Sequence, residues 1–119
     1  MGEVRVGIVV ENPRTGARSE ELMAVADTGA TLAIVPAATL RRLGIEPASR
    51  VSVVLADGRR ASRDVANAVI VIDGESTACR VMFGDSGDAV LVGVTVLEQT
   101  GLAVDPVQRR LVRTDLRLY

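Results

Sequence analysis

The chain contains no His, no Trp and a single Cys among its 119 residues, and because all 14 basic residues are Arg it also lacks Lys. A Ser-His-Asp or Cys-His nucleophile system needs an imidazole base, and Schiff-base chemistry needs a Lys amine. Most zinc sites need His or several Cys, so no metal site is expected. Catalysis by this chain would therefore depend on its 15 acidic residues, together with hydroxyls, Arg and backbone amides.

Length, composition and charge indicate one ordinary domain that spans residues 1–119. A hydrophobic content of 48% is enough to build a core at this size. The formal net charge of −1 gives no basic surface for a phosphate backbone or an anionic membrane. We therefore expect neither nucleic acid nor a membrane as a partner.

Two further features predict a cytoplasmic location. The start, Met1–Arg5, lacks the cationic and apolar pattern of a signal peptide, and the longest uncharged stretch, Thr28–Leu40, has 13 residues and contains Pro36. A membrane span needs about 20 residues. The lone Cys79 cannot form an intrachain disulfide, so it is expected to be a small buried residue in a reducing compartment.

Short segments rich in Val and Ile alternate with Gly, Pro, Asn and Asp, a pattern typical of a mainly β fold. The expected strands are Glu3–Val10, a return strand that ends at Ala26, Thr31–Val35, Val51–Ala56, Arg60–Ala66, Val69–Ile72, Ala78–Phe83, Ala89–Val92, Leu102–Asp105 and Arg110–Leu118. The dipeptides Asp57-Gly58 and Asp73-Gly74 fit two-residue type I′ turns, so each predicts a hairpin.

Two short helices are predicted among these strands. Pro36–Arg42 precedes Gly44, and Val94–Thr100 precedes Gly101, so each segment ends at a glycine that can stop a helix. Each segment also follows an apolar strand. This repetition indicates either an approximate internal two-fold or the common geometry of a strand that enters a helix, and both interpretations stay open.

The segment Asp27–Ala30 stands between two strongly apolar runs, Leu22–Ala26 and Leu32–Val35. A carboxylate in this position should be partly desolvated, which suits it to proton transfer. The alternative is an ordinary Asx turn between two strands, and the local pattern alone favours it. A second match, Asp85-Ser86-Gly87, lies in a polar segment and is expected to form a solvated loop.

Two blocks in the right order resemble the retroviral-type (retropepsin-like) aspartic proteases, and more closely their small prokaryotic relatives. The first is Ala24–Leu32, AVADTGATL, followed by Ile34–Pro36 at the start of a helix; the second is Ala89–Gly93, AVLVG, which leads to a helix. The resemblance covers almost the whole chain. It implies a mainly β fold, a small closed β-barrel with one or two short helices and one lobe per chain, with a hairpin flap where this chain turns at Asp57-Gly58.

The resemblance implies an aspartic endopeptidase that acts on peptides or proteins and needs no cofactor. Two carboxylates in contact share one proton, so that one activates a water molecule while the other protonates the peptide carbonyl. The chain is too short for two lobes. The second catalytic residue would therefore be Asp27 of another copy, which makes a homodimer a condition for activity.

Individual roles follow from the same resemblance. Asp27 is similar to the catalytic aspartate, Thr28 to the hydroxyl that ties the two active-site loops together, and Gly29 to the position where the backbone approaches water and substrate closely.

The predicted flap tip and the C-terminal strand each leave two interpretations open. Asp57, Gly58 and Arg59 would contact substrate, yet viral flap tips are glycine-rich and apolar. This charged tip is either a solvated hairpin end or a selector of acidic peptides. The strand after Pro106 either pairs with the N-terminus across the dimer or turns its Arg residues to solvent.

Two other functional classes also remain at this point. The same dimeric fold could serve as a peptide-binding or assembly module that cleaves slowly or not at all, since fold alone does not establish function. An unrelated small β-barrel with an incidental Asp-Thr-Gly would instead be a stable monomer. Pepstatin-sensitive cleavage of casein separates the first alternative from a protease, and sedimentation identifies the second.

Ala30 leads to a prediction about pH. A Ser at this position could hydrogen-bond the catalytic carboxylate, whereas Ala cannot, so the carboxylates hold their shared proton to milder pH. We expect peptidase activity to be greatest above about pH 3, measured as the pH profile of peptide cleavage. An optimum below that value would contradict the assignment.

Overall fold

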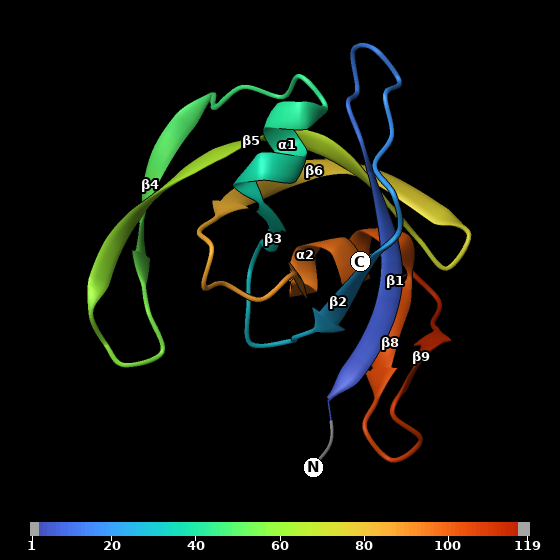
Figure 1. Ribbon diagram of the computed structural model, residues 1–119. Helices are drawn as coiled ribbons and strands as arrows, with labels where there is room; N and C mark the ends of the chain where they lie inside the picture. The colour runs from blue at the N-terminus through green and yellow to red at the C-terminus, as the bar shows by residue number, and fades with distance from the viewer. Residues whose placement is uncertain (1–2, 117–119) are drawn as a thin grey trace.

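The structure is a computed structural model that describes residues 3–116, and it is mainly β as predicted (Figure 1). In chain order the elements are β1 (Val4–Glu11), β2 (Leu22–Ala26), β3 (Ala33–Pro36), α1 (Ala37–Arg42), β4 (Ser49–Val54), β5 (Arg60–Ile72), β6 (Glu75–Gly84), β7 (Leu91–Val92), α2 (Val94–Thr100), β8 (Leu102–Asp105) and β9 (Arg110–Arg113).

The strands of the main sheet pair around a ring. Their order is β1-β2-β7-β3-β6-β5-β4, and β1 pairs in addition with β5, so the sequence of pairings returns to its first strand. Strand β4 joins only β5 and lies outside this ring. Side chains along β1 point alternately into and out of the ring, which gives the ring an apolar interior: Ile8 and Val10 are buried, while Arg5 is exposed.

The core fills the inside of the ring and the space beneath the helices. Its fully buried side chains are mostly β-branched, which suits the pleated surface of a sheet. The largest of them are Ile8, Leu40, Ile70, Ile72, Val10, Val35, Val65, Val81, Val92 and Val96. Cys79 is buried as predicted, and burial raises the pKa of its thiol to about 11.

Strand β5 corrects the sequence prediction. The expected strands Arg60–Ala66 and Val69–Ile72 form one strand of 13 residues, and Asn67 and Ala68 continue its pairing with β6 without interruption. The same strand pairs with β4 near its beginning and with β1 near its end. The long curved ribbon of β5 therefore belongs both to the ring and to the projecting β4–β5 hairpin (Figure 1).

The two Asp-Gly turns differ from one another. Asp73 and Gly74 both have positive φ, 50° and 80°, between the paired residues Ile72 and Glu75, so the predicted type I′ turn is confirmed.

At the other hairpin the type I′ prediction is wrong. Only Gly58 has positive φ, its N–H donates to the carbonyl of Leu55, and the N–H of Leu55 donates to the carbonyl of Arg59. This is a three-residue loop with a left-handed glycine as its third residue, which needs no positive φ at Asp57.

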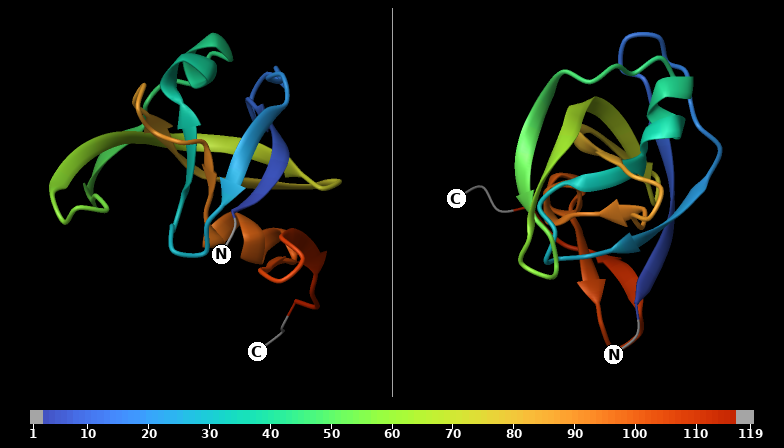
Figure 2. Two further views of the ribbon diagram at one scale, coloured as in Figure 1. Left: turned by 60° about the horizontal axis from the view of Figure 1, so that its bottom comes forward. Right: turned by 60° about the vertical axis from the view of Figure 1, so that its left-hand side comes forward.

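Both predicted helices are present. The first begins one residue later than expected because Pro36 is extended and ends β3. Gly44 and Gly101 follow the two helices with φ of 80° and 71°. The left view of Figure 2 shows α1 at one end of the ring and α2, with β8 and β9, at the other.

The C-terminal segment forms a separate two-stranded sheet, β8–β9. The predicted strand Arg110–Leu118 stops at Arg113, and its last two residues, 117 and 118, lie outside the described part of the chain. Arg113 joins this sheet to the β5–β6 turn through ion pairs with Asp73 and Glu75.

Within residues 3–116 no helix is long and apolar enough to cross a membrane. The cytoplasmic location stays a prediction.

Ile70 tests the packing of the ring. It is fully buried in β5, where the strand contacts both β1 and β6. Ile70→Ala should lower the free energy of unfolding by about 2–5 kcal/mol, because it leaves a cavity that the ring cannot close. Val54→Ala, at a side chain 65% exposed, should change it by less than about 0.5 kcal/mol in the same urea titration. Equal effects of the two substitutions would contradict this core.

Candidate active site

The end of β2 places Asp27 beside β7, so the two resembling sequence blocks meet in space. Strand β2 runs parallel to β7, with Val25 opposite Leu91 and Ala26 opposite Val92. The backbone N–H of Asp27 continues this ladder and donates to the carbonyl of Val92 at 2.9 Å. The backbone of Asp27 is therefore fixed by the barrel rather than by a free loop.

The carboxylate is oriented by its own turn. Asp27 Oδ1 accepts the N–H of Gly29 at 2.8 Å, and the carbonyl of Asp27 accepts the N–H of Ala30 at 3.2 Å. The Asx turn considered from the sequence is thus present, and it holds one carboxylate oxygen in place. Within the described chain no side chain or backbone group donates to Oδ2. That oxygen can accept or carry a proton.

Backbone bonds from α2 hold the other side of the loop. The N–H of Val94 donates to the carbonyl of Ala30 at 2.7 Å, and the N–H of Thr95 donates to the carbonyl of Thr31 at 3.2 Å. The loop therefore lies against the first turn of α2. The left view of Figure 2 shows this closeness, with the loop between β2 and β3 beside the start of α2.

Gly93 makes this contact possible. A Cβ at this position would lie 2.7 Å from the carbonyl oxygens of residues 30, 31 and 32. Real Cβ atoms do not approach backbone oxygen so closely, and here three rigid carbonyls surround the position. Only glycine fits, which explains the glycine in the second block in physical terms.

The outer surface of the loop is open. Asp27 is half-buried, as expected for a carboxylate between two apolar runs, and Ala30 is also half-buried. Thr28 and Gly29 are exposed. In the single chain, the loop therefore presents a hydroxyl and a bare backbone segment next to an oriented carboxylate.

The tip of the β4–β5 hairpin lies apart from this loop. Asp57 Oδ2 accepts the Arg59 Nε–H at 2.6 Å. The backbone N–H and the guanidinium of Arg59 hold the pKa of the Asp57 carboxyl below its usual range. The tip and the loop reach the same side of the molecule (Figure 1), but no hydrogen bond or ion pair joins them within residues 3–116.

The two faces of this hairpin differ in polarity. The register of β4 and β5 places one set of side chains on the outer face: Arg50, Ser52, Val54, Arg60, Ser62 and Asp64. All are exposed except Asp64, which is half-buried and accepts a hydrogen bond from Arg50. The other set is half-buried and mostly apolar: Val51, Val53, Leu55, Ala61 and Arg63. The inner face is therefore apolar below the charged tip, a distinction that the composition of the tip did not reveal.

The second motif match has a different environment. Asp85 is 70% exposed in the loop after β6, as expected, but it pairs with Arg63, which reaches it from the inner face of the hairpin. Sequence reasoning missed this contact. The available signal was the position of Arg63 among inward-facing apolar residues at alternate places in the strand.

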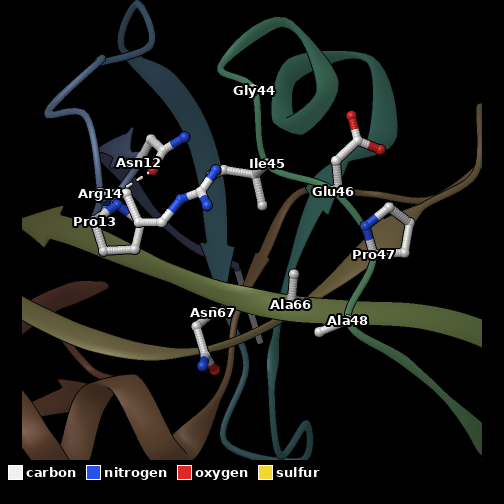
Figure 3. Close-up of a pocket in the computed structure, with 10 residues that line it drawn as sticks. All are labelled: Asn12, Pro13, Arg14, Gly44, Ile45, Glu46, Pro47, Ala48, Ala66 and Asn67. Atoms are coloured by element: carbon white, nitrogen blue, oxygen red, sulfur yellow. Dashed lines mark hydrogen bonds between the residues drawn. The ribbon is translucent and has the colours of Figure 1, made fainter.

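A depression of about 350 Å³ lies at the opposite end of the ring, between the β1–β2 turn, the segment after α1, and β5 (Figure 3). Asn12 lines it and joins two of its sides, since its buried amide donates to the carbonyl of Leu43 and accepts the N–H of Arg14. Glu46 is the only carboxylate that lines it, so it offers no pair of acids. We place the candidate chemistry at Asp27.

Comparisons with known proteins agree with this geometry. Residues 17–99 match the family model described as "gag-polyprotein putative aspartyl protease". The solution structure of simian foamy virus (mac) protease is similar, with a TM-score of 0.55 and 20% identity over 78% of this chain and 90% of that chain. At this identity, the likeness shows the fold. No curated protein matches the chain.

Gly93 gives a test of the contact between loop and helix. Gly93→Ala should displace residues 30–32 or strain them, and overpacking of this kind costs about 1–3 kcal/mol of unfolding free energy. The matched control is Gly87→Ala, where an added Cβ meets nothing within 4 Å. Denaturant unfolding, with amide chemical shifts of residues 27–32, measures both effects. Equal behaviour of the two variants would contradict the contact.

Proposed function

Because the chain belongs to the gag-polyprotein aspartyl protease family, we propose that it is an aspartic endopeptidase whose active site forms between two copies. The observation that carries this proposal is the Asp27 loop. It combines a half-buried carboxylate, oriented through one oxygen, with exposed neighbours at Thr28 and Gly29. An orientation of this kind suits a group that must meet both a water molecule and a second carboxylate.

One chain supplies one such carboxylate. Asp85, the other motif match, lies in a different loop from Asp27 and pairs there with Arg63. A two-fold axis beside the exposed loop would bring Asp27 against its symmetry mate, and both halves of the site would then be identical. Thr28 of each copy would support the contact between the two loops.

The proposed reaction follows from the charge of such a pair. Two carboxylates in contact cannot both ionise easily, so they hold one proton between them. The ionised carboxylate takes a proton from water as the oxygen attacks the peptide carbonyl, and the protonated carboxyl gives its proton to the carbonyl oxygen. The carboxyl that took the proton from water then gives it to the nitrogen as the C–N bond breaks and the amine leaves. One hydroxyl of the intermediate returns a proton to the other carboxylate, so the pair again holds one proton.

We assign the β4–β5 hairpin to the role of a flap over the substrate. Its half-buried inner side chains, Val53, Leu55 and Ala61, would face the peptide. Asp57 and Arg59 pair with each other at the tip. This pairing favours a solvated hairpin end over the selection of acidic peptides.

Substitution of the carboxylate tests the assignment. Asp27→Asn should lower kcat by roughly 10²–10⁴-fold or more, because the amide can neither take a proton from water nor give one to the carbonyl. Cleavage of a peptide library at several pH values measures the loss and the sequence preference together. Glu46→Gln, in the distant depression, removes one negative charge and should leave kcat unchanged.

Several outcomes would contradict the proposal. Full activity of Asp27→Asn would exclude the carboxylate mechanism. Binding of peptide that is recovered uncleaved from a dimer would indicate the peptide-binding module instead. A stable monomer in sedimentation, active or not, would exclude a site shared between two copies.

A further inference from the structure

Arg63 is the one charged side chain on the otherwise apolar inner face of the β4–β5 hairpin. It lies opposite Val51 in the hairpin register, and its side chain is only 17% exposed. Its guanidinium contacts two carboxylates of the loop between β6 and β7: Nη2 lies 3.4 Å from Asp85 Oδ2, and Nε lies 3.6 Å from Asp88 Oδ2. The hairpin is therefore tied, close to its base, to a segment outside the hairpin.

The loop that receives Arg63 is itself well fixed. The N–H of Asp85 donates to Asp88 Oδ2 at 2.8 Å, and the N–H of Asp88 donates to the carbonyl of Asp85 at 2.9 Å. Gly84, where the loop begins, lies so close to β3 that an added Cβ would be 2.9 Å from Ile34 Cγ2. The Asp88 carboxylate is thus held by a backbone N–H, and the backbone of Asp85 is held within the same turn.

The same segment leads directly to the candidate active site. Asp88 lies three residues before Leu91, the first residue of β7, and the carbonyl of Val92 in β7 accepts the N–H of Asp27. The segment 84–92 therefore contacts the hairpin through Arg63 and the catalytic loop through β7. Among the described residues, the ion pairs of Arg63 with Asp85 and Asp88 link the hairpin to this segment.

A neighbouring arginine provides a contrast within the hairpin. Arg50 points outward and donates to Asp64 Oδ1 at 2.8 Å on the partner strand. That ion pair joins β4 to β5 and stays intact when the hairpin moves as a unit. The Arg63 contacts must break in the same movement, because they join the hairpin to the barrel.

We propose that Arg63 is a positioning residue that latches the β4–β5 hairpin to Asp85 and Asp88, and so sets how readily the hairpin opens above Asp27. The proposal rests on the proposed function only where it concerns substrate. At 3.4 and 3.6 Å, the contacts of Arg63 with Asp85 and Asp88 are ionic contacts rather than short hydrogen bonds. The mostly buried guanidinium loses both carboxylate partners whenever the hairpin lifts, which disfavours the open arrangement. It keeps only the carbonyl of Ser62, to which Nη1 donates at 3.1 Å.

Hydrogen exchange tests the latch without any need for activity. In Arg63→Gln, amide exchange in β4 and in residues 60–64 should accelerate about three- to tenfold, because the hairpin opens more often. Asp85→Asn should have a similar effect, and the double variant should add little to either single one. Arg50→Gln is the matched control, with the same charge removed from the outer face. The free energy of unfolding of each variant confirms that the barrel is folded.

The kinetic readout distinguishes positioning from catalysis. With peptide substrate, Arg63→Gln should change KM several-fold more than kcat, whereas Arg63→Lys should retain most of the wild-type KM because it keeps the charge. If no variant, the wild type included, cleaves peptide, the proposed function fails while the exchange data still decide the latch. The latch is overturned if Arg63→Gln and Arg50→Gln exchange alike, or if the effects of Arg63→Gln and Asp85→Asn simply add.

Discussion

The close contact between the loop after β2 and the segment around Gly93 is the constraint on which the rest of the site depends. Four backbone bonds hold it: the N–H of Asp27 to Val92, the N–H of Val25 to Val90, and the N–H groups of Val94 and Thr95 to the carbonyls of residues 30 and 31. The last two are possible only because residue 93 has no Cβ, which would meet the carbonyl oxygens of residues 30–32 at 2.7 Å. Buried backbone groups must be paired, and this contact pairs those of the loop, while the N–H of Gly29 within the loop orients the carboxylate.

Strand β5 connects this site to the rest of the molecule. It closes the ring with β1, forms the largest pairing with β6, and then continues as one arm of the hairpin. Strand β5 runs without interruption from the hairpin into the ring, so a movement of the hairpin would bend that strand. Arg63 lies in this strand near the base of the hairpin, so its ionic contacts can bias the position of the hairpin.

Much of this architecture could be predicted from local pattern. Alternation identified most strands, and glycines marked the ends of both helices. The two Asp-Gly dipeptides show the limit. At Asp73-Gly74 the flanking residues Ile72 and Glu75 pair directly, and both turn residues adopt positive φ. Around Asp57-Gly58 the hydrogen bond between Leu55 and Arg59 leaves a loop of three residues, in which only the glycine adopts positive φ. The same dipeptide serves either turn, and the pairing of the flanking strands selects one.

The sequence alone determined which chemistry was available, because the missing His and Lys left carboxylates. Its apolar runs, together with the resemblance to the aspartic proteases, made Asp27 the candidate. It did not show that the backbone of Asp27 would be bonded to β7, or that the Arg63 side chain would be mostly buried against Asp85 and Asp88. The physical reason is separation along the chain. Side-chain alternation and turn preference act over a few residues, whereas these contacts join strands that meet only when the ring of pairings closes.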